Sequence, residues 1–314
     1  MARKKKRWPR DEVLYNKVQE SEFLHFFDYV RYLTNYVCKG KKMKQMIQCL
    51  LIWRKFPNLS VRRARGFLLL LKRFGIINVD IPCFKTLSNY NENNSLQIIL
   101  ERLMEESSKP LSVIEHNFAT DMTGIITALF TSWFSIRAKK KTRRRDHVRD
   151  HITVGVKSMI VPAVDIRMKE GEDNIILQGH VDKVVEDFTI NDWLGDSKYW
   201  CKKNCSKIAA IGGKPYFKCK TGKTAWNGKQ DGYPSWKEMN KESEEHPRRY
   251  KKHYRMRVKV ECTIHSKKAI HGDKVYSKLP SARNNEETLR WINHNINVLN
   301  RARVEWNINP RFMD

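Results

Sequence analysis

Long apolar runs and carboxylates are both scarce in this chain of 314 residues. Apolar runs such as Phe67–Leu71 fall far short of the roughly 20 residues that span a bilayer, so we expect no membrane segment. Asp and Glu number 34 against 61 Lys and Arg, a formal net charge of +27. That excess indicates a polyanionic partner, nucleic acid first. A membrane surface is the weaker alternative, because no long helix with one apolar face stands out, and a structural basic protein stays open on charge alone.

Paired cysteine motifs and a signal-peptide pattern are also missing. The seven cysteines are odd in number and irregular in spacing, which predicts reduced thiols in an intracellular chain. Since targeting signals are lacking, we expect a cytoplasmic, nucleoid-associated location. Cys201, Cys205 and Cys219 are the candidates for a zinc site, but no paired C-x-x-C motif follows them. Free thiols are therefore the expectation.

The first part of the chain, residues 1–107, is predicted to be a mainly helical DNA-binding domain with a basic N-terminal arm, MARKKKRWPR. Ser60 is a favourable N-cap and Gly75 a favourable stop for one helix, and Pro82 is placed to open the next. Short helices, tight turns and basic side chains favour a helix-turn-helix, although a helical bundle with a basic surface stays open. The basic side chains are Arg62, Arg63, Arg65, Lys72, Arg73 and Lys85.

The second part is predicted to be a mixed α/β domain over residues 112–306, after a polar linker at 104–112. β-Branched and aromatic residues predict strands, and residues 174–187 fit a helix between them. The expected strands or extended segments are 112–121, 126–136, 151–158, 159–167, 188–196, 206–213 and 215–220.

Three acids stand out in this basic chain. Asp121 and Asp196 each lie at the end of a predicted strand, and Glu261 is the lone carboxylate among the cations of YRMRVKVECTIHSKK, residues 254–268. Read as one helix, this segment aligns Glu261 with Tyr254, Arg257, His265 and Lys268 on one polar stripe. A solvated face with ordinary ion pairs is the alternative reading for Glu261, and a turn or helix cap is the alternative for each Asp.

Acids near a phosphate repel it unless a divalent cation lies between them. Two Mg²⁺ or Mn²⁺ ions held by Asp121, Asp196 and Glu261 would activate water or a sugar 3′-hydroxyl and stabilise the leaving oxygen. Hard oxygen ligands suit these ions better than zinc.

With these residues in place, the chain resembles DDE transposases of bacterial and archaeal insertion sequences, the subgroup with a YREK signature. Tyr254, Arg257, Glu261 and Lys268 match that signature at its full spacing. ATDMTG around Asp121 resembles the first acidic motif. Asp196, Ser197, Lys198 and Tyr199 resemble the second, with Lys198 at a position that usually holds a small residue. The tail NNEETLRWINHNINVLNR is similar to the helix that closes the catalytic domain, and the likeness covers about residues 115–303.

The resemblance implies an RNase H-like catalytic domain and a transposase that binds the terminal inverted repeats of a mobile element. It would cleave the DNA ends and join them to target DNA by two-metal phosphoryl transfer, as a dimer on double-stranded DNA. Asp121, Asp196 and Glu261 would be the catalytic metal ligands, and Tyr254, Arg257 and Lys268 would hold phosphates. A metal-dependent nuclease or resolvase without strand transfer is one alternative. A catalytically inactive domesticated DNA-binding protein is the other.

Two further segments are expected to meet DNA. The basic run at residues 135–149, which includes Arg143, Arg144 and Arg145, is either a solvated hairpin tip or a clamp on the DNA backbone. A loop insertion is expected at about 221–248. Its Trp226 or Trp236 would either stack on an unpaired base or pin the loop to the protein.

Overall fold

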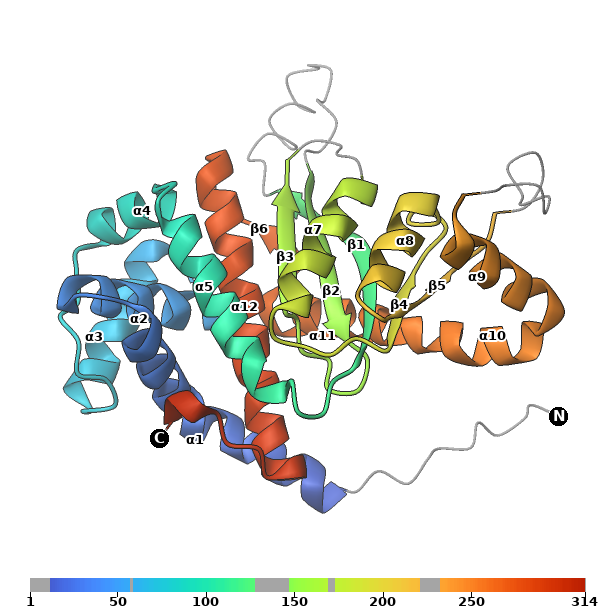
Figure 1. Ribbon diagram of the computed structural model, residues 1–314. Coiled ribbons are helices and arrows are strands. Elements are labelled where there is room, and N and C mark those ends of the chain that lie inside the picture. The colour runs from blue at the N-terminus through green and yellow to red at the C-terminus, as the bar shows by residue number, and fades with distance from the viewer. Residues whose placement is uncertain (1–11, 57–58, 128–146, 169–172, 221–231, 314) are drawn as a thin grey trace, which may run out of the picture.

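The computed structural model describes residues 12–56, 59–127, 147–168, 173–220 and 232–313 (Figure 1). In this part of the chain, six strands form one mixed sheet with helices on both sides. The strands are β1 (Asn117–Thr127), β2 (His147–Gly155), β3 (Ala163–Arg167), β4 (Asp192–Gly195), β5 (Lys214–Phe217) and β6 (Lys274–Val275). The expected α/β class with a mixed sheet flanked by helices is confirmed.

The strand order is β3-β2-β1-β4-β5, with β6 also paired to β1. β1, β2 and β3 form an antiparallel meander, whereas β4 and β5 run parallel to β1. β4 pairs with β1 over Asn117–Thr120, and β6 pairs with it only at Ile126 and Thr127. Since β2 covers the other edge of β1, a gap between β4 and β6 leaves residues 121–125 without a described strand partner on that side.

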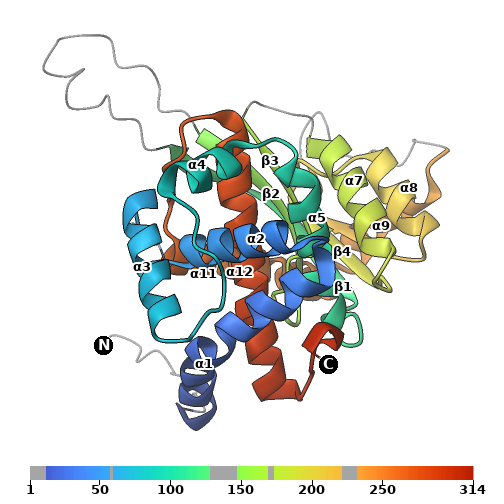
Figure 2. The same ribbon diagram turned by 90° about the vertical axis from the view of Figure 1, so that its left-hand side faces the viewer.

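Helices of the α/β part cover opposite faces of the sheet. They are α7 (Asp173–Val185), α8 (Lys202–Ala210), α9 (Pro234–Glu245), α10 (Pro247–Tyr254) and α11 (Val258–His271). On β2, Asp150 contacts Lys267 of α11, while Thr153 contacts His180 of α7. Residues an odd number apart on a strand point to opposite faces, so α7 and α11 lie on either side of the sheet, as both ribbon views show (Figure 2).

The N-terminal part is helical, as predicted. It consists of α1 (Glu12–Val37), α2 (Lys41–Lys55), α3 (Val61–Arg73), α4 (Phe84–Glu92) and α5 (Leu96–Ser108), followed by the 3₁₀ turn η1 (Lys109–Leu111). The Ser60 hydroxyl accepts a hydrogen bond from the Arg63 amide at 3.4 Å. Gly75, at φ +72°, allows the amide of Ile76 to reach the carbonyl of Leu71. Both predicted limits of α3 are therefore confirmed.

The long helix α12 (Pro280–Trp306) lies between the N-terminal helices and the α/β part, and η4 (Arg311–Met313) follows it. It packs against α1, α2, α4 and α5 on one side and against α11, β3 and β6 on the other. Its asparagines anchor the N-terminal helices: Asn293 donates to the carbonyl of Leu51, and Asn295 donates to the hydroxyl of Ser107. The predicted tail helix is confirmed, and it joins the two halves of the sequence.

Three local predictions were wrong. Residues 206–210, expected in a strand, belong to α8, where Cys205 and Ile208 face the core with helical spacing. The expected linker at 104–112 begins inside α5, where Met104 and Ser107 are buried. Residues 254–268 do not form one helix, because a 3₁₀ turn, η3 (Arg255–Arg257), separates α10 from α11.

The expected loop at about 221–248 contains much regular structure. Residues 221–231, with Trp226, lie outside the described residues, and α9 and the start of α10 occupy most of the rest. Trp236 is 3% exposed and packs against Trp200, with the ring centroids 5.3 Å apart and the rings tilted by 39°. Of the two readings for Trp236, the structure supports attachment of this segment to the protein.

Candidate active site

Asp121 lies near the middle of β1, where the sheet is open between β4 and β6. Its neighbours Ala119 and Thr120 still pair with β4, and the pairing of Thr120 with Gly195 brings Asp196, the next residue, beside Asp121. The two carboxylates therefore lie beside each other on adjacent parallel strands. Asp196 directly follows β4, close to its predicted strand end, but the strand end predicted at Asp121 was wrong, because β1 continues to Thr127.

Gly195 determines where Asp196 can lie. A Cβ atom at this position would meet the ring of Phe217 at 2.9 Å and the ring of Tyr199 at 3.0 Å. Only glycine fits between these buried rings, so β4 can approach β5 closely before it ends. Asp196 then turns the chain, and its carboxylate accepts a hydrogen bond from the Lys198 amide at 2.8 Å. Asp196 therefore forms a turn, as one reading of the sequence predicted, and it also lies beside Asp121.

Glu261, on α11, lies near Asp121, because both carboxylates bind the guanidinium of Arg257. The guanidinium of Arg257 donates to Asp121 Oδ2 from Nη1 at 2.8 Å and to Glu261 Oε1 from Nη2 at 2.5 Å. Asp121 and Arg257 are 136 positions apart in the sequence. Asp121 and Glu261, from distant segments, thus share one guanidinium, and Asp196 lies beside Asp121.

Tyr254 and Lys268 complete the arrangement along β1. The ammonium of Lys268 donates to the Thr123 hydroxyl at 2.7 Å and to the Gly124 carbonyl at 3.1 Å. That carbonyl is available because no described strand pairs with this stretch of the edge. The guanidinium of Arg257 lies 5.9 Å from the ring centroid of Tyr254. Of the signature residues, Arg257 and Lys268 therefore contact β1 directly, while Tyr254 and Glu261 lie beside Arg257.

Burial dominates the electrostatics of the site. It raises the pKa of Asp121, and the neighbouring Asp196 adds to the rise, while the Met122 amide and Arg257 oppose it. Burial also raises the pKa of Tyr254. The pKa of Lys268 is lowered by burial and by the adjacent Lys267. The site thus holds partly buried carboxylates whose charge the surrounding cations only partly balance.

A metal site is not preformed in the described residues, where no group of three or more Asp, Glu, His or Cys side chains is close enough to hold an ion. The chemistry of the donors nevertheless fits Mg²⁺ or Mn²⁺, because Asp121, Asp196 and Glu261 offer hard oxygens. Arg257 bridges two of these carboxylates, so their oxygens already point toward one cationic centre.

Some predicted residues cannot be placed in this site. Arg143, Arg144 and Arg145 lie outside the described residues. His265 is exposed on α11, and nothing ties it to the acids.

Sequence reasoning missed a buried ionic cluster behind the site. The ammonium of Lys267 contacts Glu287 and lies 3.5 Å from Asp150, and all three side chains are fully buried. Arg290 extends the cluster by pairing with Glu287 at 2.6 Å. The local pattern gave no signal for it, because adjacent lysines and the Glu286–Glu287 pair look like solvated charges.

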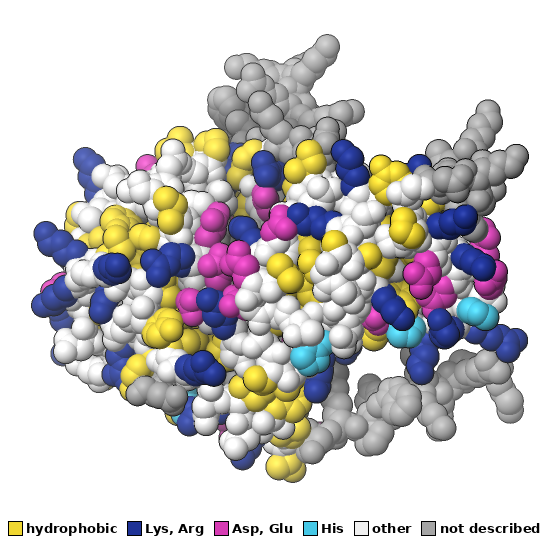
Figure 3. Space-filling model, in the orientation of Figure 1, with side chains coloured by type: hydrophobic (Ala, Val, Ile, Leu, Met, Phe, Trp, Pro, Cys, Tyr) yellow, Lys and Arg dark blue, Asp and Glu magenta, His cyan; other side chains and the backbone are white. Residues whose placement is uncertain are grey.

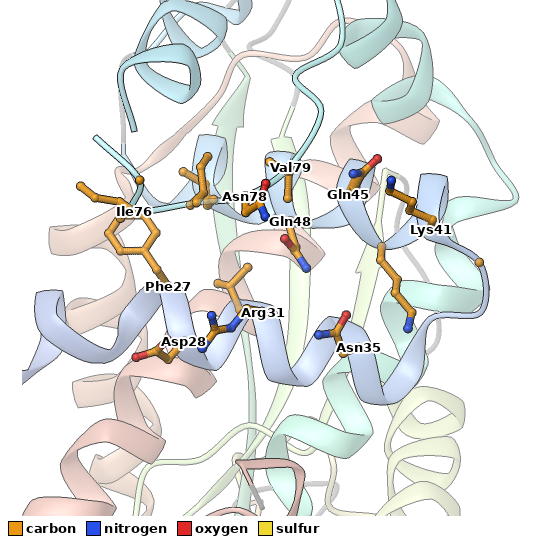
Figure 4. Close-up of a pocket in the computed structure, with 16 residues that line it drawn as sticks. Phe27, Asp28, Arg31, Asn35, Lys41, Gln45, Gln48, Ile76, Asn78 and Val79 are labelled. Carbon is orange, nitrogen blue, oxygen red and sulfur yellow. Dashed lines mark hydrogen bonds and ion pairs between the residues drawn. The ribbon is translucent and has the colours of Figure 1, made fainter. Parts of the chain in front are cut away.

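A separate cavity of about 560 Å³ lies between α1, α2 and the segment after α3 (Figure 4). Its walls include the ion pair of Arg31 with Asp28 at 2.9 Å, and Gln48, whose amide donates to Thr34. The acids of the candidate site are not among its lining residues. We therefore base the chemistry on the gap beside β1 and not on this cavity.

Sequence comparison finds no protein family that matches the chain. It also finds no curated protein with significant similarity. Among the described helices, none combines the length and the apolar character that crossing a membrane requires.

Proposed function

We propose that this chain is a DDE-type transposase that binds the ends of a mobile element, cleaves them and joins them to target DNA. One arrangement supports the proposal: Asp121 lies beside Asp196 and shares the guanidinium of Arg257 with Glu261, although the three acids come from distant segments. A solvated helix face would not bring Glu261 and Asp121 to the same guanidinium.

The sheet supports an RNase H-like assignment for the catalytic part. An antiparallel β1–β2–β3 meander followed by β4 and β5 parallel to β1 is compatible with that fold. One acid lies on the central strand, one follows β4, and one lies on a helix after β5. This is the order that the resemblance to the family implies.

Asp121, Asp196 and Glu261 are the residues that would hold divalent ions. Bound Mg²⁺ or Mn²⁺ would supply activation of water or a 3′-hydroxyl and stabilisation of the leaving oxygen. Tyr254, Arg257 and Lys268 would hold the DNA backbone beside them. A guanidinium matches a phosphate through two parallel hydrogen bonds, and an ammonium acts as a point charge.

The charge distribution restricts where DNA can bind. On the face shown in Figure 3, acidic side chains gather over α5. Glu105 lies close to Glu186 and Asp187 there, and Lys109 pairs with Glu106. This acidic patch would repel DNA. The proposed catalytic residues approach the sheet from the α11 side, opposite α7.

The N-terminal helices are proposed to bind the element ends. Arg62 and Arg63 are exposed at the start of α3, and the guanidinium of Arg62 lies over the ring of Phe84 at 4.4 Å. Two exposed cations at one end of a short helix suit contact with a phosphate backbone. Since an element has two ends, we expect a dimer on DNA.

The test uses donor DNA with the inverted repeats that flank the gene, incubated with Mg²⁺. Wild-type protein should give cleaved and joined products, whereas Asp121→Asn should retain DNA binding and lose both. Asp182→Asn, which changes a surface acid paired with Lys207, is the matched control and should behave like wild type. Cleavage without joining would indicate the nuclease alternative, and equal cleavage by wild type and Asp121→Asn would refute the catalytic assignment.

A further inference from the structure

Arg257 is held in an unusual way for a cation on a DNA-binding surface. Its side chain is 19% exposed, and both terminal nitrogens bind carboxylates, one on β1 and one on α11. An ordinary helical ion pair would join Arg257 to Glu261 alone and would be worth only a few tenths of a kcal/mol. The additional hydrogen bond to Asp121 holds the guanidinium of Arg257 between the carboxylates of Asp121 and Glu261.

This position conflicts with metal binding by the same acids. The bonds from Arg257 occupy Asp121 Oδ2 and Glu261 Oε1, the kind of oxygen that a divalent ion needs as a ligand. A divalent ion added beside the guanidinium would also bring like charges together. Arg257 and the metal therefore compete for these two carboxylates.

A phosphate is a suitable alternative partner for the guanidinium. Arg257 sits in the short 3₁₀ turn between α10 and α11, and its Nε atom is buried with no hydrogen-bond partner among the described residues. Arginine binds phosphates through two parallel donors, and Nε with one terminal nitrogen forms such a pair. A phosphodiester at this turn would satisfy Nε and draw the side chain away from the acids.

We propose that Arg257 closes the acid site in the free protein and that a DNA phosphate releases it, so that divalent-ion binding depends on DNA binding. The inference rests on the proposed function, because it takes Asp121 and Glu261 as ligands. By linkage, the factor by which DNA raises metal affinity equals the factor by which the metal raises DNA affinity.

The experiment measures Mn²⁺ binding directly, from the paramagnetic resonance signal of free Mn²⁺, with and without a short duplex DNA. Wild-type protein should bind Mn²⁺ weakly, and DNA should raise its affinity by about tenfold or more. Arg257→Gln should bind Mn²⁺ about tenfold more tightly than wild type without DNA, and DNA should then add little. Arg255→Gln, an exposed neighbour in the same turn, should match wild type.

Two outcomes separate failure of the inference from failure of the proposed function. If Arg257→Gln binds Mn²⁺ no more tightly than wild type, while Asp121→Asn abolishes binding, the metal site stands and the closing role of Arg257 is wrong. If the double variant Arg257→Gln, Asp121→Asn binds Mn²⁺ as well as Arg257→Gln, the ion does not bind these acids, and both proposals fail. Unchanged thermal unfolding of each variant confirms that it is folded.

Discussion

At the scale of single residues, Lys267 shows how this basic chain buries charge. Its ammonium is fully buried between Glu287 and Asp150 and lies 5.0 Å from the ring centroid of Trp291. Burial and the nearby Glu287 raise the pKa of Asp150 to about 8. Although burial opposes it, Lys267 and Arg290 hold the pKa of Glu287 down, to about 2. Of the two carboxyl groups, Glu287 is therefore the stronger acid, because Lys267 and Arg290 both lie beside it.

We expect Lys267→Met to destabilise the protein by about 3 kcal/mol, because it removes one partner of a buried ion pair. Lys259→Met is the matched control on the same helix, since Lys259 is exposed, and should change stability by less than about 0.5 kcal/mol. Urea unfolding followed by circular dichroism measures both. Equal midpoints for the two variants would show that the buried cluster does not stabilise the fold.

At the scale of elements, the end of β4 is where packing determines the site. Gly195 lets Phe217 of β5 lie against the backbone directly before Asp196. A strand end this close to buried rings cannot shift without moving the carboxylate that follows it. The position of Asp196 therefore depends on a residue that has no side chain of its own.

Two glycine-to-alanine changes should have opposite effects. Gly195→Ala should cost about 1–3 kcal/mol through overpacking and should also impair DNA cleavage, because Asp196 moves. Gly66→Ala, in the middle of α3 with no atom within 4 Å of the added Cβ, should gain about 0.5–1 kcal/mol. Thermal unfolding and the cleavage assay together test both. A stable, active Gly195→Ala would contradict this account of β4.

At the scale of the whole molecule, a net charge of +27 coexists with an acidic patch over α5. Cations beside this patch, such as Lys109, already have carboxylate partners. Exposed cations on other elements, such as Arg62 and Arg63 of α3, are the candidates for contact with a polyanion. The distribution of charge, more than its total, should set the affinity for DNA.

Removing cations from different places should therefore have different effects on DNA binding. Replacing Arg143, Arg144 and Arg145 with Ala should reduce the slope of log affinity against log salt by roughly 2 to 3, if each contacts one phosphate. Replacing Lys109, Lys183 and Lys207 with Ala removes the same charge beside acidic partners and should leave the slope nearly unchanged. Fluorescence anisotropy over a salt series measures both variants. Equal salt slopes for the two variants would mean that the basic run at residues 135–149 is a solvated hairpin tip and does not contact the DNA backbone.

The sequence alone predicted those features of the structure that depend on residues close together in the chain. It determined the limits of α3, the presence of a strand at Asp121 and of one directly before Asp196, and the helix α12, because caps and apolar periodicity act over a few residues. It also identified the acids and the fixed spacing from Tyr254 to Lys268.

Only the tertiary structure decided how those residues meet. The 3₁₀ turn at Arg257, its bridge between Asp121 and Glu261, and the burial of Lys267 depend on contacts between segments more than a hundred residues apart. The error at 206–210 also comes from packing, because α8 packs against α7, α9 and β5, and these contacts and not strand propensity determined a helix. Local patterns carry no information about such contacts, because their energies arise only once the sheet and α11 have come together.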